Sequence, residues 1–240
     1  MIRYLFIFWY CFGLILMLTI GVPTWLSFSN GLFLVFFALY AIHIEGMMGE
    51  ERRRSWSRIM LVGVLTFAVE WLGVTMGWPF GDYKYTSLLG ISLGGVPLAI
   101  FCAWIGVIVT VMRMTAFSNR WTRALHTGLW TVVFDLVLDP VAFARQFWIW
   151  HEPGDFYGIP AANFISWFVI SAAISFLFPL REVSANVRIE AVRLTQMMLF
   201  MFGLLGAKEG LMMPFIIALA AIVVAEGAGR IDRIRLKQVV

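Results

Sequence analysis

The stretch Gly158-Ile159-Pro160-Ala161-Ala162-Asn163-Phe164-Ile165-Ser166-Trp167 repeats, without a gap, the pattern of Gly95-Val96-Pro97-Leu98-Ala99-Ile100-Phe101-Cys102-Ala103-Trp104. Both fit Gly-[Val/Ile]-Pro-x-Ala-x-Phe-x-x-Trp. Proline suits the first turn of a helix, where its missing N–H costs nothing, so each copy predicts a helix start. A Gly-Asp-aromatic segment precedes each copy, and its acids, Asp82 and Asp155, are expected to be equivalent and to shape their loops.

The rest of the chain is too apolar for a soluble domain, with 61% hydrophobic and only 13% charged residues. Apolar stretches long enough to cross a bilayer recur along it. Eight are predicted: 4–27, 30–48, 59–77, 89–112, 122–140, 160–180, 191–206 and 210–227. The last two are short and close together, so a count of seven stays open. We expect the first to be a retained helix rather than a removed signal peptide.

The positive charges favour one orientation. With eight spans and a cytoplasmic N-terminus, fifteen of the eighteen Lys and Arg residues fall on the cytoplasmic side, and Lys84, Arg145 and Lys208 fall outside. The fifteen include a run at 52–54 and, near the C-terminus, Arg230, Arg233, Arg235 and Lys237. The chain is therefore expected in the cell membrane, multi-pass, with both termini cytoplasmic. Its basic charge then reflects topology and lipid contact, with no need for nucleic acid.

The predicted fold is an all-α, polytopic helical bundle that forms one integral membrane domain, residues 1–240. The third and fourth predicted helices, 59–112, and the fifth and sixth, 122–180, form two hairpins that run in the same directions. Such a parallel repeat is related by an axis along the membrane normal. Its two loops, 78–88 and 141–159, lie on the non-cytoplasmic side, so the hairpins are expected to enclose a cavity near the outer leaflet.

Three acids lie within predicted spans, where ionisable groups are costly and most often functional. Asp135 and Asp139 are one helical turn apart, which places their side chains about 6 Å from each other. Both cannot ionise cheaply in an apolar setting, so a neutral acid beside a charged base is expected. Glu70 is expected to face the same cavity. The alternative for all three is a structural hydrogen bond, whereas Glu45 is expected to anchor the cytoplasmic end of its helix.

Aromatic residues crowd the same rim, among them Trp71, Trp78, Tyr83, Tyr85 and Trp150, and Trp167 ends the second motif copy. An interfacial aromatic belt accounts for part of this pattern. Aromatic faces also stabilise cations in a desolvated site. The two cysteines, Cys11 and Cys102, and the three scattered His residues form no metal-ligand spacing, so no metal, cofactor or disulfide is expected.

Several of these segments together resemble the CruF-type carotenoid biosynthesis family, which includes the bisanhydrobacterioruberin and γ-carotene hydratases. The resemblance covers residues 40–180 and rests on Glu70, the segments 78–85, 95–97, 135–142 and 148–150, and the second motif copy. It implies a cofactor-independent hydratase that adds water to the terminal double bond of an acyclic carotenoid. Its partners would be that lipid-soluble substrate, membrane lipids and other carotenoid biosynthesis enzymes.

That chemistry needs a strong acid, a base that activates water and aromatic faces for a tertiary cation. We assign Asp139 as the proton donor, Asp135 as the neighbour that adjusts its acidity, and Glu70 as the base that orients water. The roles of Asp139 and Glu70 could be exchanged. Tyr83, Tyr85 and Trp150 would flank the cation, and Asn163 would position water or a carboxylate. Trp71, Trp78 and Trp167 complete the expected substrate-binding set.

Two other functions compete with this interpretation. A UbiA-type prenyltransferase needs two Asp-rich motifs to hold Mg²⁺ and diphosphate, but the sequence has one Asp-x-x-x-Asp, on the predicted outer side. A transporter would also carry buried carboxylates and a repeat. Its acids are not expected to cluster with aromatics at one side. The sequence leaves open which carotenoid is the substrate, whether one or both ends react, and the oligomeric state.

Overall fold

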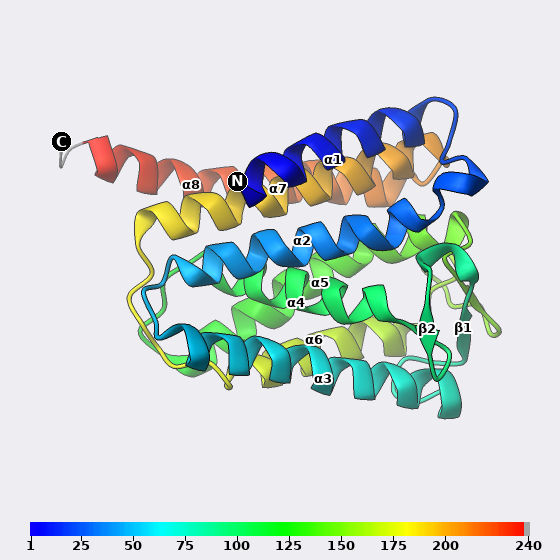
Figure 1. Cartoon of the computed structure of the whole chain (residues 1–240), viewed down its shortest axis with the longest axis horizontal. Helices are drawn as coiled ribbons and strands as arrows, with labels where there is room; N and C mark the ends of the chain where they lie inside the picture. The colour runs from blue at the N-terminus through cyan, green and yellow to red at the C-terminus, as the bar shows by residue number, and fades with distance from the viewer. Residues whose placement is uncertain (238–240) are drawn as a thin grey trace.

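The chain folds into a bundle of helices that lie side by side, with short β-strands at one end (Figure 1). This computed structural model describes the backbone of residues 1–237 and the side chains of residues 1–227. The α-helices of this part are α1 (Ile2–Leu18), α2 (Phe28–Gly46), α3 (Arg52–Met76), α4 (Leu98–Arg113), α5 (Arg120–Ala144), α6 (Ala161–Ser175), α7 (Ala185–Lys208) and α8 (Met212–Lys237). The side chains of Arg230, Arg233, Arg235 and Lys237, predicted to be cytoplasmic, lie outside the described residues.

The described residues, 1–237, contain the eight helices that were predicted. The alternative of seven fails because Gly210 adopts a left-handed backbone, with φ of 77°, between α7 and α8. Among the described residues, four segments are long and apolar enough to cross a membrane: Thr24–Gly46, Arg52–Met76, Arg120–Ala144 and Ala185–Lys208. Their length and composition are those of a multi-pass membrane protein.

Three predicted helices are longer than the observed ones; 160–180 corresponds to α6, which ends at Ser175, and the other two contain backbone breaks. The segment 4–27 is not one helix: α1 ends at Leu18, and a 3₁₀ turn (Thr24–Leu26) precedes α2. Gly21, with φ of 79°, and Pro23 interrupt it. The segment 89–112 likewise becomes helical only at Leu98, because Gly94 and Gly95 take positive φ values. Apolar composition alone did not reveal either break.

The structure is mostly helical, and two small β-ribbons that the sequence did not indicate lie at one end of the bundle. Strand β1 (Tyr83–Tyr85) pairs antiparallel with β4 (Trp148–Trp150), so that Tyr83 faces Trp150 and Tyr85 faces Trp148. Strand β2 (Ser92–Leu93) pairs with β3 (Val96–Pro97). The first ribbon joins the α3–α4 connection to the α5–α6 connection.

The repeated motif has a structural counterpart in its second half. Pro97 and Pro160 are the N-caps of α4 and α6 and have nearly the same backbone angles, φ −62° and ψ 136° against φ −64° and ψ 140°. The Gly-Asp segments before them differ. Asp82 binds His151, with Oδ1 to Nδ1 at 3.0 Å, whereas Gly154 and Phe156 bridge to Gly158 and Ile159. Asp82 and Asp155, predicted to be equivalent, therefore occupy different places.

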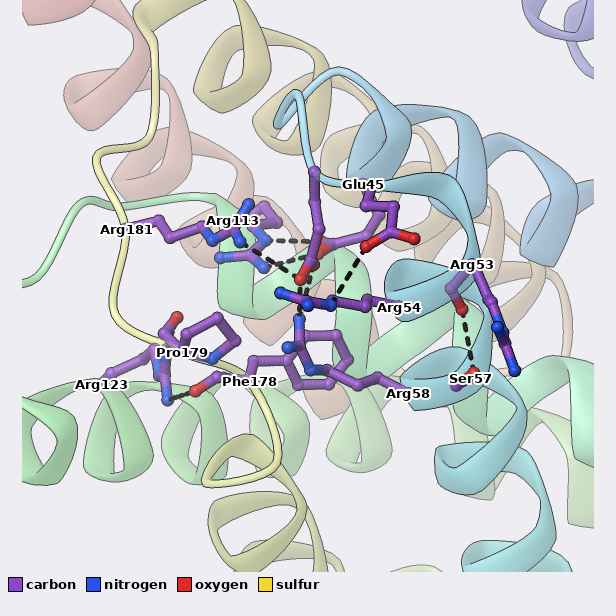
Figure 2. A network of polar contacts seen from close by, with 12 residues as sticks. Glu45, Arg53, Arg54, Ser57, Arg58, Arg113, Arg123, Phe178, Pro179 and Arg181 are labelled. Carbon is purple, nitrogen blue, oxygen red and sulfur yellow. Dashed lines mark hydrogen bonds and ion pairs between the residues drawn. The ribbon is translucent and has the colours of Figure 1, made fainter.

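The end of the bundle away from the strands carries a network of ion pairs (Figure 2). Its centre is Glu45 of α2, whose two carboxylate oxygens accept hydrogen bonds from Nε and Nη2 of Arg113 at 2.6 and 2.7 Å. Both side chains are almost completely buried. Glu50 binds Arg58 and Arg181 nearby, and Arg123 donates to the backbone carbonyls of Ser175, Phe178 and Pro179. The ion pair between Glu45 and Arg113 agrees with the expectation that Glu45 anchors its end of α2.

Candidate functional site

The carboxylate of Glu70 is buried in the middle of three hydrogen-bond donors. Its Oε2 accepts from the hydroxyls of Tyr83 at 2.5 Å and Tyr85 at 2.7 Å, and its Oε1 accepts from Trp104 Nε1 at 2.7 Å. Glycine at position 73 makes this approach feasible. A Cβ there would lie 2.8 Å from the Phe80 ring and 2.9 Å from the Tyr83 hydroxyl. The loop after α3 therefore folds back directly onto its own last turns.

The two phenols of this cluster act as donors. Burial, followed by the negative charge of Glu70, raises the pKa of Tyr83 and of Tyr85 well above the usual value for tyrosine. Both therefore stay protonated and can donate to the carboxylate throughout the physiological pH range. The indole N–H of Trp104 can only donate. Three such donors satisfy a carboxylate in its ionised form.

Asp135 and Asp139 form the second acidic group, one turn apart on α5 and both buried. They share one donor group, because Nδ2 of Asn163 on α6 donates to Oδ2 of Asp135 at 2.8 Å and to Oδ2 of Asp139 at 2.7 Å. The other oxygen of Asp135, Oδ1, is buried without a hydrogen-bond partner among the described residues. Compared with Glu70, this pair has two carboxyl groups and far fewer donors.

The two acidic groups border one cavity, with about 960 Å³ of space not filled by atoms, its open mouth included. Glu70 and Asp139 both line it, together with Tyr83, Tyr85 and Asn163. Aromatic ring pairs, one stacked and one tilted, form part of the wall near the acids. The ring centroids of Trp104 and Trp167 are 4.2 Å apart, and those of Tyr83 and Trp150 are 4.9 Å apart. The remainder is mainly apolar and includes Phe37, Val107, Met198, Met201 and Phe202 from α2, α4 and α7.

Most of the residues predicted for the site come together in this cavity. Glu70, Asp139, Tyr83, Tyr85, Trp150, Asn163 and Trp167 line it. Asp135 is not part of the lining and joins it through Asn163. Trp71 and Trp78, also predicted to bind substrate, lie outside the cavity with 47% and 66% of their surface exposed. Trp71 follows Glu70 on the helix and so projects about 100° away from it, over Gly94.

The lining also includes residues outside the predicted site set, among them Trp104, Trp148 and Asn30. Trp104 holds the position in the first motif copy that Trp167 holds in the second, so the repeat itself was a usable signal. Trp148 stands two residues from Trp150 on β4, and alternation along a strand would have paired them. Asn30 of α2 comes into the cavity by long-range packing, which no local pattern indicated. In the described part of the chain, no three or more His, Cys, Asp or Glu side chains are grouped to hold a metal ion.

Residues 29–225 match the family model described as carotenoid biosynthesis protein. The chain belongs to this family. The matched range contains Glu70, Asp135, Asp139 and the aromatic walls around them, whereas α1 lies outside it. The family membership therefore covers the whole polar part of the cavity.

A curated relative is the bisanhydrobacterioruberin hydratase of Haloarcula japonica, which is 28% identical over 178 residues. The alignment covers 66% of this chain and 60% of the relative, so the chain spans about three fifths of the length of the curated protein it matches. No solved structure matches the chain significantly.

Proposed function

We propose that this protein is a carotenoid hydratase that adds water to the terminal double bond of an acyclic carotenoid end group. One observation carries the proposal: the same aromatic-walled cavity is lined by Glu70, a carboxylate held by three donors, and by Asp139, which shares a single amide donor with the buried Asp135 behind it. The family supplies the substrate class, and the name of the Haloarcula relative supplies the reaction type.

The hydrogen bonds support a division of roles between the acids. Glu70 receives three donors, which is what a stable anion requires, and it is therefore the base. Asp135 and Asp139 share a single amide, and two adjacent carboxylates in an apolar setting repel each other. The pair relieves this repulsion by keeping one proton. Asp139 lines the cavity and is the proton donor. Asp135, which does not line the cavity, adjusts the acidity of Asp139.

The reaction follows from this division. The carboxyl proton of Asp139 adds to the less substituted alkene carbon, the π electrons form the new C–H bond, and a tertiary cation results. The faces of Tyr83, Trp150 and Trp167 stabilise that cation, as does the anion of Glu70. Glu70 takes a proton from water as the water oxygen bonds to the cationic carbon. A tertiary alcohol forms, and return of one proton from Glu70 to Asp139 through solvent completes the cycle.

The membrane arrangement is part of the proposal. All eight helices would cross the bilayer of the cell membrane, with both termini cytoplasmic and the acids toward the outer leaflet. Helices α4 and α6 are short, and the 16 residues of α4 span about 24 Å of a hydrocarbon core about 30 Å thick. The ribbons before them would fill the difference, because non-helical backbone is tolerated at membrane depth where it lines a cavity.

The two hairpins, 59–112 and 122–180, would then form the predicted parallel repeat. Strands β1 and β4, one from the connection within each hairpin, pair with each other at one end of the bundle. The matching N-caps at Pro97 and Pro160 support the repeat.

Expression in a host that makes lycopene tests the reaction. We expect pigments whose mass increases by one water per hydrated end, with the hydroxyl on the tertiary terminal carbon. A control host carries the Asp139→Asn, Glu70→Gln double variant at equal membrane abundance. Unchanged pigment mass with well-inserted wild-type protein would contradict the proposal, and proton-coupled solute uptake by reconstituted vesicles would favour a transporter instead.

A further inference from the structure

A second, smaller cavity adjoins the site and lies between α1, α7 and the start of α2. It has about 400 Å³ of unfilled space, and its lining is apolar except for Ser29. Met17 and Met201 line both cavities, so these two side chains are the partition between them. Methionine is unbranched and flexible, and a partition made of it can open at little cost. The two cavities are thus nearly continuous.

Helix α1 covers this second cavity only loosely. Its buried side chains are Phe6 and Tyr10, both in its first half. No residue from 11 to 18 is buried, although Phe12, Gly13 and Leu16 line the second cavity. Figure 1 shows α1 along the outer edge of the bundle, beside α7. A cavity under the weakly packed half of an outer helix is close to the surrounding lipid.

We propose that the two cavities form one binding track for the polyene body of the substrate, which reaches the acids from the lipid beneath the second half of α1. The inference rests on the proposed function and adds the location of the polyene. A carotenoid is far longer than the reacting end group, and its apolar chain needs a path that avoids water. Met17 and Met201 line the place where the two cavities meet. Beyond them, Met198 and Phe202 line the first cavity, which Asp139 also lines.

Gly13 offers a clean way to block the track. A Cβ at this position would meet no atom within 4 Å, so a substituted side chain would start in open space. It would occupy the second cavity, which Gly13 lines. Gly46 of α2 is the matched control, because a Cβ there also meets nothing within 4 Å and the residue lines neither cavity.

The experiment compares Gly13→Phe, Gly46→Phe and wild type with two substrates that share the same end group: lycopene and a short acyclic isoprenoid. The Gly13→Phe change should lower turnover of lycopene by about tenfold or more, because it overfills the path, and should leave the short substrate within about twofold. Gly46→Phe should match wild type on both. Met17→Ala, which widens the connection between the two cavities, should increase lycopene turnover, and a loss of turnover would count against the track.

The outcomes separate this inference from the proposed function. If wild type hydrates lycopene and Gly13→Phe does so equally well, the track is wrong and the hydratase stands. If Gly13→Phe loses both substrates equally, its effect is on folding or on the acids, and the track is again wrong. If wild type hydrates neither substrate, the proposed function itself fails.

Discussion

The two ends of the bundle both bury carboxylates, but they neutralise them differently. At one end, Glu45 forms a bidentate ion pair with Arg113, and the two side chains retain 1% and 2% of their exposure. At the other end, Glu70 is held by neutral donors alone, and Asp135 and Asp139 share a neutral amide. The ion pair keeps both Glu45 and Arg113 charged. The neutral donors around Glu70 and the Asp pair allow these acids to gain or lose a proton.

The surroundings of the Glu45–Arg113 pair also differ from those of the acids at the other end of the bundle. Arg113 packs over the Phe178 ring, with its guanidinium carbon 5.6 Å from the ring centroid. At the other end, Glu70 and Asp139 line an aromatic cavity. A buried ion pair favours a structural role, whereas buried acids without a counter-charge beside a cavity favour chemistry. The comparison predicts that substitutions at the cavity end will reduce activity and those at the ion-pair end will reduce stability.

The largest expected effect is that of Asp139→Asn on catalysis. An amide has no proton acidic enough for an alkene, so turnover should fall by about 10²- to 10⁴-fold. The folded protein should persist, because one of two repelling carboxyl groups has been removed. Hydroxylated carotenoid per inserted protein measures the loss. Asp155→Asn, on an exposed loop residue, is the control and should keep full activity.

At the other end, Glu45→Gln should cost about 3–5 kcal/mol of stability, because it leaves the guanidinium of Arg113 buried and unpaired. Thermal unfolding in detergent measures the change, with Glu51→Gln as the control in an exposed ion pair with Arg54. The double variant Glu45→Gln, Arg113→Met should recover much of the loss. A stable Glu45→Gln protein that has lost activity would reverse the assignment of the two ends.

Tyr85→Phe tests the donors around Glu70 and should have a smaller effect. It removes one of three hydrogen bonds to the carboxylate, so we expect turnover to fall about tenfold with little change in stability. Tyr4→Phe, at an exposed position on α1, is the control. Unchanged turnover would mean that Glu70 does not depend on Tyr85 during the reaction, and the contrast between the two ends would then rest on the Asp pair.

Local chemistry explains which parts of this site could be predicted. The membrane class, the eight helices and the helix starts at Pro97 and Pro160 follow from apolar length and from proline geometry, which are properties of short segments. The gathering of Glu70 and Asp139 was predicted because intramembrane acids are costly and tend to share a polar environment. Trp71 was misplaced because proximity in sequence to Glu70 says nothing about which face of the helix a residue occupies.

Composition and spacing are enough to identify an apolar, multi-helix chain with three acids inside its predicted spans and aromatic residues nearby. The packing of the helices is what brings Trp104 and the two phenols to Glu70, joins Asn163 to the Asp pair and places α1 and α7 at the adjoining cavity. Such contacts join residues far apart in the chain, and they depend on how whole helices pack, which no local pattern encodes.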